Sequence, residues 1–241
     1  MKALTFAKRT AKEILRDPIN LAFGLGFPLV LILLLSAIQA NVPIALFEIQ
    51  HLTPGITVFG LSFMSLFSAT LISKDRGSSL LARLYTTPLT SLDFIAGYTL
   101  PIIPLSIAQS LICYMIAIIL GLEISVNIII AIIFIIPISV LFIGIGLLCG
   151  SLLNDKQVGG ICGALLTNLS AWLSGIWFDL ELVGGTFKKI AYALPFVHAV
   201  EAERAALSGD ILSSLPHLLW VLGYAAVIIT LAILAFVRKK D

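Results

Sequence analysis

Six long stretches without a single Lys, Arg, Asp or Glu constrain this chain more than any other feature of its sequence. They cover residues 19–40, 53–73, 94–120, 125–153, 157–178 and 215–237. A helix needs about 20 apolar residues to cross the roughly 30 Å hydrocarbon core of a bilayer. Only 12% of the residues are charged and 59% are hydrophobic, which is too apolar for a water-soluble domain. We therefore predict an all-α integral membrane protein, a single transmembrane domain over residues 1–241, with six transmembrane helices.

The basic residues between these stretches predict how the helices are oriented. Twelve of the fifteen Lys and Arg residues precede the first stretch, follow the second, fourth or sixth, and therefore share one predicted side. The other three, Lys188, Lys189 and Arg204, lie on the opposite side. Because loops rich in Lys and Arg remain in the cytoplasm, both termini are expected to be cytoplasmic.

Residues 1–17 predict an amphipathic helix that is separate from the first span. On a helical wheel, one side is apolar and the opposite side carries the basic residues, which is typical of a helix lying in the cytoplasmic membrane interface. Asp17 and Pro18 then suit the start of the first span, with Asp17 as the N-cap and Pro18 in the first helical position. The apolar side comprises Ala3, Leu4, Ala7, Ala11, Ile14 and Leu15.

The loop of residues 74–90, between the second and third stretches, has a pattern of its own. Placing Lys74, Arg76 and Arg83 at the bilayer centre would cost about 2.5–3.5 kcal/mol each, so the loop is expected to lie in the cytoplasm. Gly77 permits a break after the second span, and Ser78 can cap a short helix.

This short helix is expected to be a coupling element. Pro88 limits its length, because a proline disfavours helical backbone in the residue before it. Arg76 and Arg83 lie toward one side, whereas the other side is apolar and could dock against a partner. The apolar residues are Leu80, Leu81, Leu84 and Tyr85.

Residues 179–214, between the fifth and sixth stretches, are too polar to span a membrane. The helical spacing on both sides of Pro195 predicts two short re-entrant helices that dip into the outer leaflet and return, covered by protein. Glu201, Glu203 and Arg204 allow two interpretations. They could form a functional cluster near an exit path, or they could hold the turn together by ion pairing.

No catalytic motif points to an enzyme. The sequence contains no Walker A motif, no G-x-S-x-G and no H-E-x-x-H, and the histidines lack metal-ligand spacing. We expect no catalytic residue, no metal and no cofactor bound by this chain. The predicted spans also lack the acidic residue that an ion-coupled carrier usually needs.

Mild polar residues within the spans have two interpretations. Ser65, Gln109 and Asn168 could line a substrate path, although interhelical hydrogen bonds are the commoner use of such residues. The spacing of Gly146 and Gly150 allows close helix contact, either within one chain or between two copies.

Two segments of the sequence resemble those of a known family. The stretch DRGSSLLARLYTTPLT (75–90) resembles the signature of type-2 ABC exporter permeases, which has an acidic residue, a glycine followed by Thr or Ser, a leucine-rich turn and then Thr-Pro. The stretch LSGIWFDLELVGGTFKKIAYALPFVHAVEAERAALSG (173–209) is similar to the second signature of the family. The matching positions are Asp75, Gly77, Ser78, Leu80, Leu81, Leu84, Thr87, Pro88 and Leu89 in the first, and Ser174, Gly175, Pro195, Glu201 and Arg204 in the second.

The resemblance implies an assembly and a mechanism. Two permease copies, as a homodimer or alternatively a heterodimer, would work with two copies of a separate ATPase that holds ATP and magnesium, in the inner membrane of a prokaryote and without nucleic acid. Pro195, Glu201 and Arg204 would belong to an outer gate or its structural support. The residues that would couple to the ATPase are Asp75, Arg76, Gly77, Ser78, Leu80, Leu81, Arg83, Leu84 and Pro88.

The expected function is therefore outward transport of a small amphiphile, drug, peptide or lipid-like substrate. One alternative is a permease of the same family for a lipid-linked glycan or a haem-type cargo. Another is an ion-coupled secondary carrier, although no internal repeat relates residues 1–120 to residues 121–241. A third is a membrane assembly or immunity factor that transports nothing.

Overall fold

The computed structural model describes residues 2–43, 47–78, 80, 86 and 89–238, and every regular element in these ranges is helical. Two of the elements, η1 and η2, are π-helical. In chain order the elements are α1 (Lys2–Leu15), α2 (Pro18–Leu21), η1 (Ala22–Gly26), α3 (Phe27–Gln39), α4 (Ile49–Gly77), α6 (Ser91–Thr99), α7 (Ile102–Ile119), α8 (Asn127–Leu152), α9 (Asp155–Val158), η2 (Gly159–Leu166), α10 (Thr167–Trp172), α11 (Leu180–Val183), α12 (Gly185–Ala193), α13 (Pro195–Ser208) and α14 (Ile211–Arg238). The predicted all-α class is confirmed.

Five helical segments are long and apolar enough to cross a membrane, so the chain is a multi-pass membrane protein. The fifth of the predicted spans, residues 157–178, is not among them and falls on α9, η2 and α10. These elements form a helical run over 155–172 that begins with Asp155 and Lys156. At 1.5 Å per residue this run is about 27 Å long, slightly short of the hydrocarbon core, and six spans remain a prediction. The five segments are Pro18–Gln39, Ile49–Gly77, Leu92–Ile119, Asn127–Leu152 and Ile211–Ala235.

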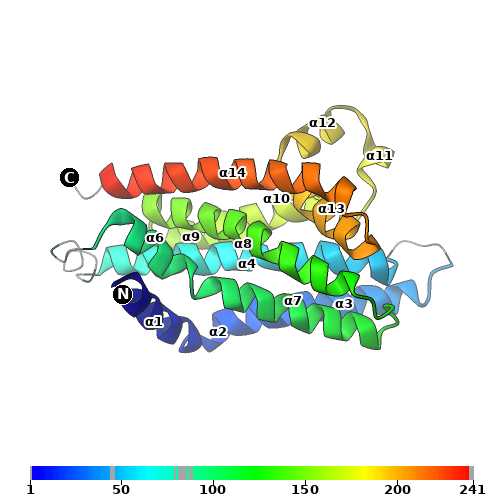
Figure 1. Ribbon diagram of the computed structural model, residues 1–241, viewed down its shortest axis with the longest axis horizontal. Helices are drawn as coiled ribbons and strands as arrows, with labels where there is room; N and C mark the ends of the chain where they lie inside the picture. Colours follow the sequence, from blue (N-terminus) through cyan, green and yellow to red (C-terminus); the bar gives the residue numbers. More distant parts are fainter. Residues whose placement is uncertain (1, 44–46, 79, 81–85, 87–88, 239–241) are drawn as a thin grey trace.

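The long helices run side by side and give the bundle two distinct ends (Figure 1). One end holds the start of α1, the end of α14 and the end of α4, and we call it the terminal end. The other end holds α11, α12 and the start of α4, and we call it the distal end. The start of α1, the end of α14 and the end of α4 therefore lie together, as the charge pattern predicts.

Helix α4 is the central element, and glycines on α8 let it pack closely. A Cβ on Gly146 would overlap the backbone oxygen of Ser65, and one on Gly150 would come within 2.6 Å of the backbone oxygen of Ala69. Gly146 and Gly150 therefore serve contact between two helices of one chain. Close backbone approach of this kind stabilises helix pairs in lipid, where apolar burial alone gives little driving force.

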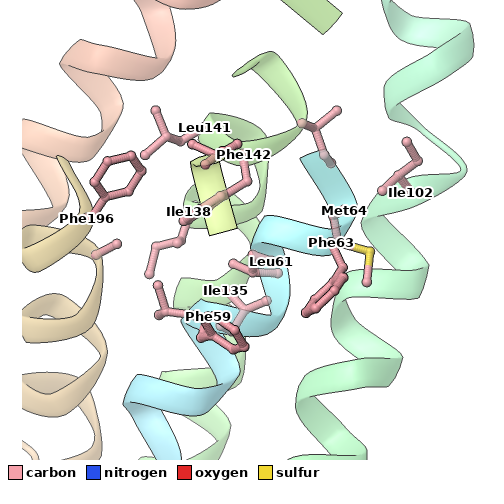
Figure 2. Packing of buried hydrophobic residues seen from close by; sticks show 14 of the residues in the cluster. Phe59, Leu61, Phe63, Met64, Ile102, Ile135, Ile138, Leu141, Phe142 and Phe196 are labelled. Carbon is pink, nitrogen blue, oxygen red and sulfur yellow. The ribbon is translucent and has the colours of Figure 1, made fainter. Parts of the chain in front are cut away.

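The core around α4 is filled by large apolar side chains from four helices (Figure 2). Leu61 and Met64 of α4, Ile138 of α8 and Ile102 of α7 are fully buried. Phe196 of α13 reaches the same cluster, with its ring centroid 6.1 Å from that of Phe142. Residues 179–214, which we call the distal segment, therefore pack directly against the membrane spans through α13.

The N-terminal helix α1 packs against α6, and its buried face differs from the predicted apolar side. The buried residues are Phe6, Ala7, Thr10 and Ile14, whereas Leu4 and Leu15 are exposed. The boundary after α1 is confirmed: the Asp17 side chain accepts from the Asn20 amide, and Pro18 begins α2.

The distal segment contains the two helices predicted around Pro195. Helix α12 precedes this proline, and α13 begins with it. A further short helix, α11, comes before both. Helix α13 packs against α4, α8 and α14, so protein surrounds much of its surface, as a re-entrant helix requires.

Candidate functional site

The last turn of α4, at the terminal end, contacts several neighbouring elements through successive side chains. Ser73 contacts α9, and Lys74 contacts the link between α1 and α2. Asp75 contacts both α1 and α6, and Arg76 contacts the end of α8. We call these four residues the α4 junction. The four residues thus connect the end of α4 to α9, α1, α6 and the end of α8.

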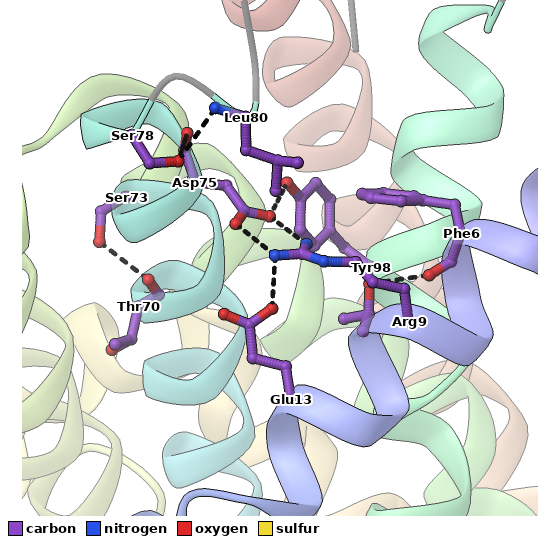
Figure 3. A network of polar contacts seen from close by, with 10 residues as sticks. Phe6, Arg9, Glu13, Thr70, Ser73, Asp75, Ser78, Leu80 and Tyr98 are labelled. Atoms are coloured by element: carbon purple, nitrogen blue, oxygen red, sulfur yellow. Dashed lines mark hydrogen bonds and ion pairs between the residues drawn. The ribbon is translucent and has the colours of Figure 1, made fainter. Parts of the chain in front are cut away.

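Asp75 forms the strongest contacts of the α4 junction (Figure 3). Its side chain is almost completely buried, at 3% exposure of the residue. The Arg9 guanidinium donates from Nη1 to Oδ2 at 2.6 Å and from Nη2 to Oδ1 at 2.8 Å. The Tyr98 hydroxyl donates to Oδ2 at 2.7 Å. A bidentate arginine and a hydroxyl thus fix both oxygens of the carboxylate.

The packing of α1 on α6 brings Arg9 to this position. The Phe6 ring lies edge-on to Phe94 and Tyr98, with centroid separations of 5.6 and 5.0 Å. It occupies the space above Gly97, where any Cβ would overlap it. Phe6 precedes Arg9 by one helical turn, so docking of the ring directs the guanidinium toward the end of α4.

Electrostatics support the same arrangement on the α1 side. Arg9 also pairs with Glu13 at 2.7 Å, one turn further along α1. The hydrogen bonds from Arg9 to Asp75 raise the pKa of Arg9, while burial raises the pKa of Glu13. The Arg9 side chain remains 37% exposed, so water can reach the cation but hardly reaches the Asp75 carboxylate.

The other members of the α4 junction bind the elements on its opposite side. Arg76 Nη1 donates to the backbone oxygens of Gly150 at 2.7 Å and Leu153 at 3.2 Å. These carbonyls belong to the C-terminus of α8, where a positive charge is favoured. Ser73 donates to Asp155 at 3.2 Å. Lys74 lies 3.7 Å from Asp17 in a half-exposed pair that adds little stability.

The predicted coupling helix follows the α4 junction, and only its beginning is described. Helix α4 ends at Gly77, and the Ser78 hydroxyl accepts from the Leu80 amide at 3.2 Å, in keeping with the predicted cap. Gly77 does not adopt a positive φ, so the break does not depend on glycine geometry. The predicted coupling residues Leu81, Arg83, Leu84 and Pro88 lie outside the described residues.

Glu201 and Arg204 lie in one environment, whereas Glu203 lies in another. Arg204 donates to Glu201 at 2.8 Å, to the backbone oxygen of Gly175 at 3.0 Å and to that of His51 at 3.3 Å. It therefore ties α13 to the start of α4 and to the chain after α10, while Pro195 is buried at the start of α13. Glu203 takes no part in this cluster and lies buried on another face of α13.

Arg204 and Glu201 also line a cavity of about 420 Å³ at the distal end. Its wall combines the acidic residues Glu48, Asp179 and Glu201 with apolar side chains such as Ile176. Arg204 adds a basic group to the same wall. The cavity lies at the opposite end of the bundle from the α4 junction.

The three candidate path residues do not share one environment. Ser65 and Gln109 are completely buried on α4 and α7, and Gln109 packs directly against Gly60. Asn168 is exposed on α10, where its amide donates to the backbone oxygen of Ala164 at 2.8 Å. A common role for the three residues remains a prediction.

Arg9 and Tyr98 are partners of Asp75 that the sequence does not predict, and Glu203 lies apart from Glu201 and Arg204, with which the sequence groups it. In the sequence, Arg9 is one of several basic residues on the polar side of α1. A signal for Glu203 is present in the sequence, because Phe196, Val200 and Glu203 share one face of α13. An acid in line with buried apolar residues predicts a buried carboxyl group.

The α4 junction consists of paired polar groups. Among the residues that the structure describes, no three His, Cys, Asp or Glu side chains are grouped so that they could hold a metal ion. The polar groups of the α4 junction pair with side chains of neighbouring elements or with backbone carbonyls. Their arrangement joins helices that the sequence places far apart.

Comparison with protein families identifies the chain. The sequence model described as ABC-2 type transporter matches residues 2–207, which include α1, the α4 junction and nearly all of α13. A comparison with curated proteins finds no match. Because the family match covers most of the chain, this protein belongs to the ABC-2 type transporter family.

Proposed function

We propose that this member of the ABC-2 type transporter family is the permease subunit of an exporter driven by a separate ATP-binding-cassette ATPase. The family supports a membrane translocation subunit, and the proposal adds the route by which energy enters. In this proposal the ATPase docks on the apolar residues after α4, among them Leu80, and moves the end of α4. ATP and magnesium are bound by the ATPase alone.

The observation that carries the proposal is the α4 junction. A docking segment can move the spans only if it is held firmly against them. The buried Asp75–Arg9–Tyr98 contacts join the end of α4 to α1 and α6, and Arg76 joins it to α8. A displacement of the chain after α4 by the ATPase therefore tilts several helices together.

The proposed orientation follows from charge. The terminal end carries most of the Lys and Arg residues, so we place it in the cytoplasm, next to the ATPase. The distal cavity then faces outward, and its acidic wall favours small amphiphiles with a positive charge. Two permease copies in a prokaryotic inner membrane, with two ATPase copies below them, complete the proposed assembly.

An isolation experiment tests the docking step. We expect the tagged permease, purified from its native membranes, to bring with it magnesium-dependent, vanadate-sensitive ATP hydrolysis. The double variant Leu80→Asp plus Leu84→Asp should lose at least tenfold of this activity, because two charges would have to enter an apolar interface.

A matched variant controls for the charge itself. Leu182 and Val183 are more than half exposed on α11, outside the candidate membrane spans, and changing both to Asp should leave the co-purified hydrolysis unchanged. If the Leu80 and Leu84 variant retains all the hydrolysis, the ATPase does not dock on this segment.

A further inference from the structure

Glu203 is a fully buried carboxyl group that the proposed coupling mechanism does not use. It lies on α13 with no exposure to solvent. Its Oε1 atom is 2.6 Å from the Thr57 hydroxyl of α4 and 2.8 Å from the Tyr114 hydroxyl of α7. Its Oε2 atom is buried, and no described residue offers it a hydrogen-bond partner. One carboxyl group thus joins three helices at the distal end.

Among the described residues, no cation pairs directly with Glu203. The neighbouring Arg204 is turned away, since its guanidinium binds Glu201 and two backbone oxygens. Within the described part of the chain, Glu203 forms no ion pair at 4.0 Å or less. A carboxylate buried without a partner or a full set of donors is strongly unfavourable, and such a group takes up a proton instead.

The hydrogen bonds of Thr57 point to the same protonation state. Its hydroxyl oxygen lies 2.8 Å from the Pro54 carbonyl and 3.0 Å from the Thr53 carbonyl, as well as beside Glu203. A hydroxyl has one hydrogen to donate. With a neutral Glu203, Thr57 donates its one hydrogen to the carbonyls of its own helix, which share it, and accepts the proton of the carboxyl group. With an ionised Glu203, Thr57 would have to donate to the carboxylate, and neither carbonyl would receive a hydrogen.

The titratable groups on the surrounding helices leave this conclusion unchanged. Helix α7 presents Tyr114 and Cys113, neither of which is a cation. Helix α8 carries Cys149 alone, near the terminal end. On α14, His217 is occupied with His198 of α13, where the two Nδ1 atoms are 2.7 Å apart.

The titratable groups of α4 and α12 are also paired, exposed or distant from Glu203. His51, near the start of α4, contacts Arg204 through its backbone oxygen. Lys74, Asp75 and Arg76 belong to the α4 junction, at the terminal end. On α12, Lys188 pairs with Glu181, Lys189 is exposed, and the backbone oxygen of Tyr192 binds His198.

We propose that Glu203 is a proton-binding site that holds α13 against α4 and α7 while the distal end is closed, and that it releases its proton when the distal end opens. Proton binding by Glu203 is a property of the closed protein alone. Proton release rests on the proposed export cycle, in which α13 moves away from α4. Once hydrated, the carboxyl group would ionise at neutral pH and the three-helix contact would be lost. Re-binding of a proton would then accompany closure.

Linkage gives the size of the effect. Burial raises the pKa of Glu203 to about 8, whereas a hydrated glutamate has a pKa near 4.3. The closed state therefore binds one more proton than the open state between these values. The ratio of closed to open protein falls about tenfold for each pH unit in this window, and it is constant below the window.

Infrared spectroscopy of the full chain in lipid nanodiscs tests the protonation state without any ATPase. At pH 7 we expect the carbonyl stretching band of a neutral carboxylic acid, absent from Glu203→Gln and retained in the control Glu201→Gln, whose acid is paired with Arg204. In Tyr114→Phe the band should persist and shift, because one hydrogen bond to the carboxyl group is lost. The proposal is overturned if the wild type and Glu203→Gln have the same spectrum, or if Tyr114→Phe leaves the band unmoved.

Hydrogen exchange of α13 tests the release step. The ratio of wild-type to Glu203→Gln exchange rates, in which the intrinsic pH dependence cancels, should rise about tenfold per unit from pH 5 to pH 7. A constant ratio would refute proton release. Both readouts are independent of ATPase binding, so their failure is distinguishable from failure of the proposed function, which the co-purified hydrolysis measures.

Discussion

The unequal burial of Asp75 and Arg9 predicts that the two halves of this pair contribute unequally to stability. In Arg9→Met, the Asp75 carboxylate would remain buried at 3% exposure with Tyr98 as its donor. Removing one partner of a buried pair costs about 3–5 kcal/mol. In Asp75→Asn, the amide oxygen still accepts one hydrogen bond, and Arg9 is 37% exposed and keeps Glu13 at 2.7 Å. That change should cost about 1.5–3 kcal/mol, the value of a hydrogen bond to a charged group.

The free energy of unfolding in mixed detergent micelles measures both changes. The double variant should be less destabilised than the sum of the single variants by at least about 0.5 kcal/mol, because the orphaned carboxylate is gone. Lys8→Met, an exposed residue on the same helix, should change stability by about 0.5 kcal/mol or less. The reasoning is refuted if Arg9→Met costs no more than Asp75→Asn, or if the single effects simply add.

Three further changes test other contacts. Gly146→Val should lower the thermal midpoint, costing about 1–3 kcal/mol or more as its side chain meets the backbone of Ser65. Gly159→Val, where a Cβ meets nothing within 4 Å, should have a much smaller effect, and equal shifts would contradict the packing. Burial lowers the pKa of His198, so the fold should lose stability as the pH falls below about 6.5, the value of an unperturbed histidine. If His198→Gln shows the same loss of stability at low pH, His198 is not its cause. Arg204→Lys should cost about 1–3 kcal/mol, since one ammonium cannot replace three directed bonds, and a neutral result would exclude the structural role.

The long helices could be predicted from the sequence because their signal is local. An uncharged run of about twenty residues specifies a membrane-spanning helix, whatever it packs against. The same reasoning extends to Asp17 and Pro195, where a cap and a proline set helix boundaries. It was less reliable for residues 157–178, where the described helix, broken by a π-helical stretch, ends at Trp172.

The partners within the sites could not be predicted, because they depend on tertiary contacts. Arg9 and Asp75 are 66 residues apart, and Thr57 and Glu203 are 146 apart. Each residue has an ordinary local explanation: Arg9 as a basic residue of an amphipathic helix, and Glu203 as part of a charged turn. Only the docking of Phe6 on α6 and the packing of α13 on α4 reveal which groups meet.

The central claim is that the α4 junction carries movement from the ATPase to the distal end. Its most direct test is the rate at which a membrane-impermeant maleimide labels a Leu182→Cys reporter in the purified permease–ATPase complex, with and without ATP. We predict that ATP changes this rate severalfold in the otherwise unchanged permease. In the Asp75→Asn variant the change should be lost, while the ATPase still binds and hydrolyses ATP. An ATP-dependent change of the same size in the variant would show that the movement does not pass through the α4 junction.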